Sequence, residues 1–224
     1  ATNNRFHKSV RPNTDKTHTA MTFTPEACIH CALCVQACRD VQVNNVIGLA
    51  NRGTNSNIVF DCNDLMGDSS CVGCGECVEA CPTGALLPSA NVIRPDKKVN
   101  SVCPYCGVGC QITYHIKDNK IVKVNGRDGP SNAGRLCVKG RFGFDYVNNP
   151  QRLLKPLIRK KDVSKNDVLI DPSNPLTHFR EATWEEAIEE AAASLKNLRE
   201  FFGGNSLAGF GSAKGSNEEA YLFQ

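Results

Sequence analysis

The sequence contains little of what marks membrane proteins, nucleic-acid-binding proteins or secreted proteins. Aromatic residues make up 7% of the 224 positions, with one Trp and two Met. No apolar stretch approaches the roughly 18 residues that a membrane-spanning helix needs. The formal net charge of +3 is too small to indicate a polyanionic partner, and the sequence shows no secretory signal. We therefore expect no membrane span and no nucleic-acid partner.

Cysteine is the exception to this plain composition. The chain holds 13 cysteines, too many for chance in a protein that is otherwise ordinary. Disulfides need an oxidising compartment, whereas repeated Cys-x-x-Cys in a chain without a secretory signal favours metal binding. We therefore expect a metalloprotein in a reducing compartment, the cytoplasm.

Eight of the cysteines form two runs with the same spacing, and the second run is followed by Pro82. The runs are Cys28, Cys31, Cys34 and Cys38, then Cys71, Cys74, Cys77 and Cys81. Three thiolates at three-residue steps can wrap a loop around one cubane 4Fe–4S cluster, while the fourth is directed away. Structural zinc is the alternative, but it prefers two Cys-x-x-Cys pairs separated by a longer spacer. The spacing therefore predicts iron–sulfur clusters.

The two runs resemble those of two-cluster ferredoxins, in which the fourth cysteine of each run ligates the other cluster. The resemblance implies that one cluster uses Cys28, Cys31, Cys34 and Cys81, and the other Cys71, Cys74, Cys77 and Cys38. The first run departs from the pattern because Arg39 stands where proline is usual. Cys62 belongs to neither run, and we expect a small buried hydrophobic residue there.

A third set has different spacing and consists of Cys103, Cys106, Cys110 and Cys137. Spacing alone would also tolerate zinc here. The set closely resembles the N-terminal cluster motif of molybdenum or tungsten bis-pterin oxidoreductases. The order of all three sets over residues 20–224 resembles the catalytic subunit of cytoplasmic formate dehydrogenases.

The resemblance implies roles for three further residues. Lys139, two positions after Cys137, is expected to relay electrons between the third cluster and a pterin. Gly211 and Ser212 are expected to contact the phosphates of the pterin dinucleotide, with an ordinary glycine turn as the alternative. In the family the catalytic residues come after the last residue of this sequence, so we expect a fragment and name no catalytic residue.

The resemblance also implies a function. The chain is expected to be the electron-transfer N-terminal part of an enzyme, a formate dehydrogenase that interconverts formate and carbon dioxide. Electrons would pass from a molybdenum or tungsten bis-pterin guanine dinucleotide through three 4Fe–4S clusters to a partner, a diaphorase-type flavin and NAD subunit or a ferredoxin-type redox subunit. The alternatives are a nitrate reductase type of bis-pterin enzyme, and a non-catalytic iron–sulfur subunit like that of NADH dehydrogenase.

The predicted fold is α+β and falls into segments. Residues 1–20 are expected to be a leader or linker, 21–98 a two-cluster ferredoxin-like domain, 99–155 a small β-rich iron–sulfur domain, and 156–224 the start of an α/β molybdopterin oxidoreductase domain. Turn-rich segments predict a surface hairpin over residues 46–60 and another over residues 111–124. A capping box at Thr183 and Glu186 predicts a helix from Thr183 to about Phe202, followed by a short strand over residues 206–210 and a helix starting near Ser216.

Overall fold

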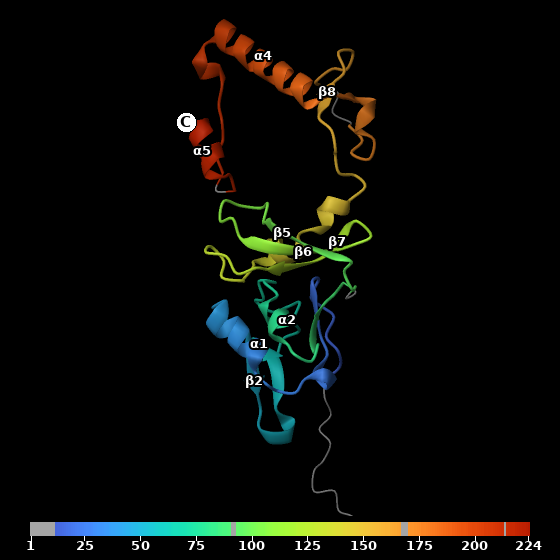
Figure 1. Cartoon of the computed structure of the whole chain (residues 1–224), viewed down its shortest axis with the longest axis vertical. Coiled ribbons are helices and arrows are strands. Elements are labelled where there is room, and N and C mark those ends of the chain that lie inside the picture. Colours follow the sequence, from blue (N-terminus) through green and yellow to red (C-terminus); the bar gives the residue numbers. More distant parts are fainter. Residues whose placement is uncertain (1–11, 91–92, 167–169, 213) are drawn as a thin grey trace, which may run out of the picture. The chain divides into compact units, whose positions relative to one another are not determined.

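The computed structural model describes residues 12–90, 93–166, 170–212 and 214–224. The chain divides into two compact units, Ala1–Asp145 and Tyr146–Gln224, both drawn in Figure 1. Helices and strands occur in each unit, so the fold mixes α and β elements as expected. Residues 1–11 of the expected leader lie outside the described residues, and the segment boundaries predicted above stay predictions.

Where the structure describes it, the first half of the first unit has two small antiparallel sheets and two short α-helices. Strand β1 (Met21–Phe23) pairs with β4 (Leu86–Pro88), and β2 (Ile47–Ala50) pairs with β3 (Asn57–Phe60). The second pairing confirms the hairpin predicted over residues 46–60. The cysteine runs begin in loops that lead into α1 (Leu33–Gln36) and α2 (Glu76–Ala80).

The hairpin is part of the core rather than a surface insertion, which corrects the sequence prediction. Ile58 and Phe60 alternate inward along β3 and are buried. The ring of Phe60 packs edge to face on Phe23, with centroids 5.7 Å apart. Fully burying a side chain of this size contributes about 1.5–3 kcal/mol. The hairpin therefore completes the hydrophobic core of this region. The two short helices are too small to form a core by themselves.

The second half of the first unit is a three-stranded antiparallel sheet in the order β5-β6-β7. Strands β6 (Gln111–Lys117) and β7 (Lys120–Gly126) are the predicted second hairpin. Strand β5 (Lys97–Val102) was not predicted, and all of it pairs with β6, from Lys97 opposite Ile116 to Val102 opposite Gln111. Helix α3 (Val138–Phe142) follows the loop that carries Cys137.

The described residues of the second unit form a two-stranded sheet and two α-helices. Strand β8 (Leu157–Arg159) pairs with β9 (Phe179–Glu181), and helices α4 (Trp184–Phe202) and α5 (Asn217–Phe223) follow. Both helices begin where capping residues predicted them.

Only half of the capping box predicted for α4 is formed. Thr183 Oγ1 accepts the main-chain N–H of Glu186 at 3.2 Å, but the carboxylate of Glu186 pairs with Arg180 rather than reaching back to the cap. At α5 both halves of the box are present, between Ser216 and Glu219. A nearby guanidinium thus outcompetes a main-chain N–H for the carboxylate, because the charged donor makes the stronger hydrogen bond.

The prediction of a strand over residues 206–210 is wrong. Gly204–Ser206 forms a 3-10 turn, and residues 207–212 belong to no helix or strand. Phe210 is 94% exposed. A strand needs a partner for its main-chain donors and acceptors, and the described residues supply none here. None of the described helices is both long and apolar enough to cross a bilayer.

Candidate iron–sulfur sites

The first candidate site lies where α1 meets the loop after α2. Four thiols line one cavity that is partly open to solvent: Cys28, Cys31, Cys34 and Cys81. Three come from the first run and one from the second. Phe23, Ile58 and Leu86 supply apolar walls, which would shield a bound group from water.

The second candidate site mirrors the first. A second cavity is lined by Cys38, Cys71, Cys74 and Cys77, three thiols of the second run and one of the first. Met21, Val46 and Ile47 form its apolar wall. The structure therefore brings together the two crossed sets that the ferredoxin resemblance implies, and the crossed ligation itself stays a proposal.

The fourth cysteine of each run lines the cavity of the other run, and the backbone conformation that places it there differs between the two runs. Cys38 lies in a π-helical turn, Ala37–Val41, that continues directly from α1. In the second run Pro82 ends the helix, and Cys81 has an extended backbone with φ −77° and ψ 114°, as expected of a residue before proline. Arg39 imposes no such restriction, so the first run stays helical one turn longer.

The loops that hold the first three thiols of each run share one backbone path. Gly73 and Gly75 have φ of 66° and 76°, and His30 and Ala32, at the same places in the first run, have φ of 55° and 61°. This left-handed conformation turns main-chain N–H groups inward. Gly73 N–H and His30 N–H each approach the sulfur of the cysteine two residues before, Cys71 and Cys28, at 3.4 Å. Such donors stabilise thiolate ligands.

Burial strongly affects the ionisation of these thiols. Burial, helped by the neighbouring Cys28, raises the pKa of Cys34 to about 11, and burial also raises the pKa of Cys77. At Cys81 burial acts in the same direction, but main-chain donors at Leu86 and its neighbours outweigh it and the pKa is lowered. Buried thiols of this kind bind metal only with release of their protons.

Mononuclear zinc fits the described residues poorly. A tetrahedral zinc site places its ligand atoms about 2.0–2.3 Å from one point. Within the part of the chain that the structure describes, no group of three or more His, Cys, Asp or Glu side chains could hold a single ion in that way. Four thiols arranged around a cavity suit the larger cubane cluster.

The third candidate site lies beside the β5-β6-β7 sheet. Burial raises the pKa of Cys103 and of Cys110, and each also feels the charges of Cys106 and Cys137, so the four predicted thiols are neighbours. Cys103 N–H donates to Cys110 O at 2.8 Å, which closes the loop that carries three of them.

Asn132 holds the loop that delivers Cys137, and the sequence analysis did not single it out. Its side-chain oxygen accepts Gln111 N–H at 3.0 Å. Its amide nitrogen donates to Gln111 O at 3.2 Å, Arg127 O at 3.2 Å and Arg135 O at 3.0 Å. One amide thus ties the loop to the start of β6. An asparagine in a Gly-rich stretch carries no signal that separates this role from an ordinary turn.

The remaining predicted site residues are all exposed. Lys139 lies on α3 two residues after Cys137, with its side chain in solvent. Ser212 Oγ accepts Lys214 N–H at 3.2 Å, and a Cβ on Gly211 would meet nothing within 4 Å. The roles of all three residues stay predictions.

Cys62 is exposed, so the expectation of a buried residue there was wrong.

Two families match the chain at these sites. Residues 27–85 match the 4Fe-4S dicluster domain, and residues 96–149 match the molybdopterin oxidoreductase Fe4S4 domain. These matches define the class of the chain by its domains: it is similar to a 4Fe-4S dicluster domain over residues 27–85 and to a molybdopterin oxidoreductase Fe4S4 domain over residues 96–149.

Individual relatives agree with this class. The chain is 34% identical to the probable oxidoreductase YjgC of Bacillus subtilis over 94% of its own length and 24% of the relative's. It is 31% identical to a Staphylococcus haemolyticus protein provisionally named as a formate dehydrogenase, over 90% of this chain and 23% of that one. It is 36% identical to the alpha subunit of an NADPH-Fe(3+) oxidoreductase of Geobacter sulfurreducens, over 89% and 22%.

The chain thus spans about a quarter of the length of the curated relatives it matches. Among solved structures, an NAD+-reducing nickel–iron hydrogenase in its H2-reduced state aligns with 36% of this chain and 35% of its own. The identity is 26% and the TM-score 0.33, a likeness too slight to carry an argument.

Proposed function

We propose that this chain is the electron-transfer part of a formate dehydrogenase, which converts formate to carbon dioxide, a proton and two electrons, and the reverse. The relative provisionally named as a formate dehydrogenase and the molybdopterin oxidoreductase Fe4S4 domain support it. The observation that best supports the electron-transfer role is the pair of cavities. Each cavity is lined by three cysteines of one run and one of the other.

The residues present fit three 4Fe–4S clusters. Two sites are the four-thiol cavities described above, and the third is Cys103, Cys106, Cys110 and Cys137. Bound there, such clusters supply one-electron transfer at potentials between about −700 and +450 mV. The protein sets where in that range each site falls, through main-chain donors such as Gly73 N–H and through apolar walls that exclude water.

The proposal gives Lys139 a specific task at the third site. A molybdenum or tungsten bis-pterin guanine dinucleotide is the proposed source of electrons, with Gly211 and Ser212 as proposed contacts of its phosphates. Lys139 is exposed two residues after Cys137, where its ammonium would hydrogen-bond the pterin, and its charge favours electron arrival. In the natural full-length protein, Lys139→Ala is expected to slow electron exit while iron content stays normal. Unchanged turnover would remove Lys139 from the pathway.

The acceptor and compartment are proposed on the same basis. We assign a diaphorase-type partner with flavin and NAD, or a ferredoxin-type redox subunit, and the cytoplasm, where thiols stay reduced. The relative named as an NADPH-Fe(3+) oxidoreductase subunit favours a second candidate, a subunit that carries electrons from a reduced nicotinamide without formate chemistry.

One experiment separates the two candidates. The natural full-length protein is prepared anaerobically, its iron, molybdenum and tungsten are measured, and reduction of a viologen dye is followed with formate and, separately, with NADPH. Formate-dependent reduction with about one molybdenum or tungsten per chain is the expected result. Iron without either metal, together with NADPH-dependent reduction alone, would reject the formate proposal in favour of the second candidate.

A further inference from the structure

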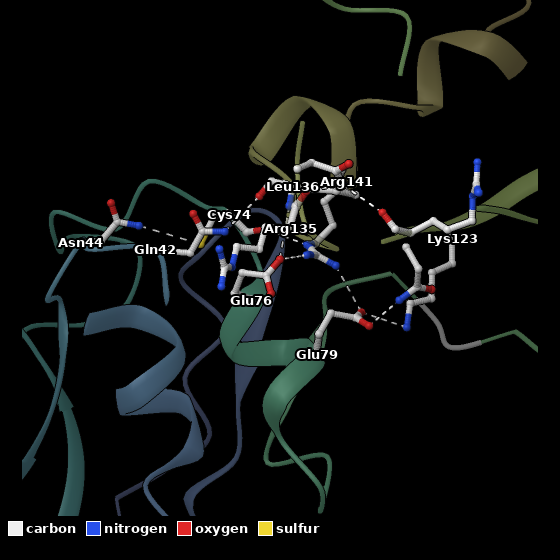
Figure 2. Close-up of polar contacts among 12 residues, drawn as sticks. Gln42, Asn44, Cys74, Glu76, Glu79, Lys123, Arg135, Leu136 and Arg141 are labelled. Atoms are coloured by element: carbon white, nitrogen blue, oxygen red, sulfur yellow. Dashed lines mark hydrogen bonds and ion pairs between the residues drawn. The ribbon is translucent and has the colours of Figure 1, made fainter. Parts of the chain in front are cut away.

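Arg141 is a buried cation that links the second and third candidate sites. Its side chain is 3% exposed and extends from α3 to the loop of the second cysteine run (Figure 2). Nε donates to Cys74 O at 2.7 Å, and Nη2 donates to the carboxylate of Glu76. Nη1 lies 3.4 Å from Glu79 Oε1. Burying an unpaired charge is costly, and here two carboxylates and a carbonyl compensate for it.

The backbone around this guanidinium is shaped to receive it. Gly75 follows Cys74 directly, and a Cβ added to Gly75 would overlap Arg141 Cδ and lie 2.8 Å from Phe142 Cζ. Val138 Cγ2 would be 3.2 Å from a Cβ on Gly73. Helix α3 therefore packs directly on the main chain of the loop that holds the second candidate site.

The residue before Cys137 is held by the same group of contacts. Leu136 N–H donates to Glu76 Oε1 at 3.3 Å, and Gln42 Nε2 donates to Leu136 O at 3.4 Å. Lys123 pairs with Glu79 at 3.0 Å, which adds a tie from β7. Figure 2 shows these contacts converging from both halves of the first unit. The loop of the third candidate site is thus fixed against the second.

Arg141 also joins ligands of the two sites through its own bonds. Its main-chain N–H donates to Cys137 O at 3.1 Å, while its Nε donates to Cys74 O at 2.7 Å. A path from Cys137 to Cys74 therefore runs through one residue and two hydrogen bonds, without a jump through space. Both carbonyls belong to predicted cluster ligands.

We propose that Arg141 is the positioning residue that sets electron exchange between the second and third sites, by fixing their distance and by favouring the reduced state at the second site. This rests on the electron-transfer function proposed above. Reduction adds negative charge to a site, and a buried cation nearby stabilises that charge. Removing the cation would also leave Glu76 and Glu79 with one counter-charge fewer, so both effects lower the reduction potential.

The test uses the natural full-length protein, prepared anaerobically, with Arg141→Met. Iron and sulfide content, the magnetic interaction between the reduced clusters by electron paramagnetic resonance, and the midpoint potential of each cluster are measured. We expect wild-type iron content, a weaker magnetic interaction, and a second site about tenfold more oxidised at a given potential, which is about 59 mV for one electron. Lys117→Met is the matched control, because Lys117 forms an exposed ion pair with Asp96 at 2.7 Å in the same unit.

Two further variants separate charge from position. Arg141→Lys keeps the charge but loses the forked geometry, so the potential should stay near wild type while the magnetic interaction weakens. Glu76→Gln combined with Arg141→Met removes one charge of each sign, so the potential should return toward wild type while the interaction stays weak.

The outcomes distinguish this inference from the proposed function. An interaction and potentials unchanged in Arg141→Met, with all clusters present, would overturn the inference alone. Loss of iron from both Arg141→Met and Arg141→Lys would also overturn it, because Arg141 would then be required only for folding. A wild-type protein without clusters would overturn the proposed function itself.

Discussion

The main chain at Gly75 and the aliphatic stem of Arg141 pack so closely that no side chain fits between them. Gly75 also has a φ of 76°, in the region where any side chain is strained. The two residues lie 66 positions apart in the sequence. The close contact therefore joins the two halves of the first unit, which come from different parts of the sequence.

Gly75→Ala is expected to destabilise the protein by about 2–4 kcal/mol, as the sum of backbone strain and overpacking against Arg141. Gly53→Ala is the control, because Gly53 has a φ of 60° and a Cβ there would meet nothing within 4 Å. That variant should lose only about 1 kcal/mol from the strain. Anaerobic denaturant unfolding measures both, and equal losses would show that the contact with Arg141 does not constrain position 75.

Cys81→Ser is expected to remove the cluster of the first site, although Cys81 belongs to the second run. Cys81 lines the same cavity as Cys28, Cys31 and Cys34, and serine is a poor substitute for a thiolate ligand. Iron content and electron paramagnetic resonance of the reduced protein measure the loss. Cys71→Ser supplies the reference spectrum of a protein that lacks the second site. A Cys81→Ser spectrum identical to that reference would reject the crossed assignment.

The protein should lose stability as the pH falls through the range below 6.5, partly because of His115. Partial burial, together with Lys98 and Lys123 on the neighbouring strands, lowers the pKa of His115 from its ordinary 6.5. The unfolded chain therefore binds a proton more readily than the folded one, so stability is complete above pH 6.5 and falls below it. His18, whose pKa burial also lowers, contributes in the same direction.

Nuclear magnetic resonance titration of His115 tests this directly. The pKa should lie below 6.5 in the wild type and rise in Lys98→Met, because one neighbouring positive charge is removed. Lys16→Met, which removes an exposed charge of the same unit that is not among those acting on His115, should leave the pKa unchanged. A value for His115 at or above 6.5 in the wild type would contradict the prediction.

Much of the local structure could be predicted from short-range patterns. Turn-rich segments around Asn51 and Asp118 predicted both hairpins, and Thr183 and Ser216 marked the starts of α4 and α5. Each of these signals acts over a few residues, so a single sequence carries it fully. The strand expected up to Phe210 failed because pairing needs a partner strand, which no local pattern guarantees.

The candidate sites show the same division between local and distant information. Spacing and the ferredoxin resemblance were enough to propose the two crossed sets of thiols. The link from Arg141 to Cys74 could not be predicted, because it depends on how α3 packs against a loop 67 residues earlier. Strand β5 was missed for a related reason: Lys97 and Lys98 give it a polar start, and its pairing with β6 decides its conformation.

The central claim is that twelve of the cysteines hold three 4Fe–4S clusters, and the most direct measurement is the iron and acid-labile sulfide content of anaerobically purified protein. The account predicts a brown protein with about twelve iron and twelve sulfide per chain, four of each per site. A colourless protein that contains zinc and no acid-labile sulfide would contradict it.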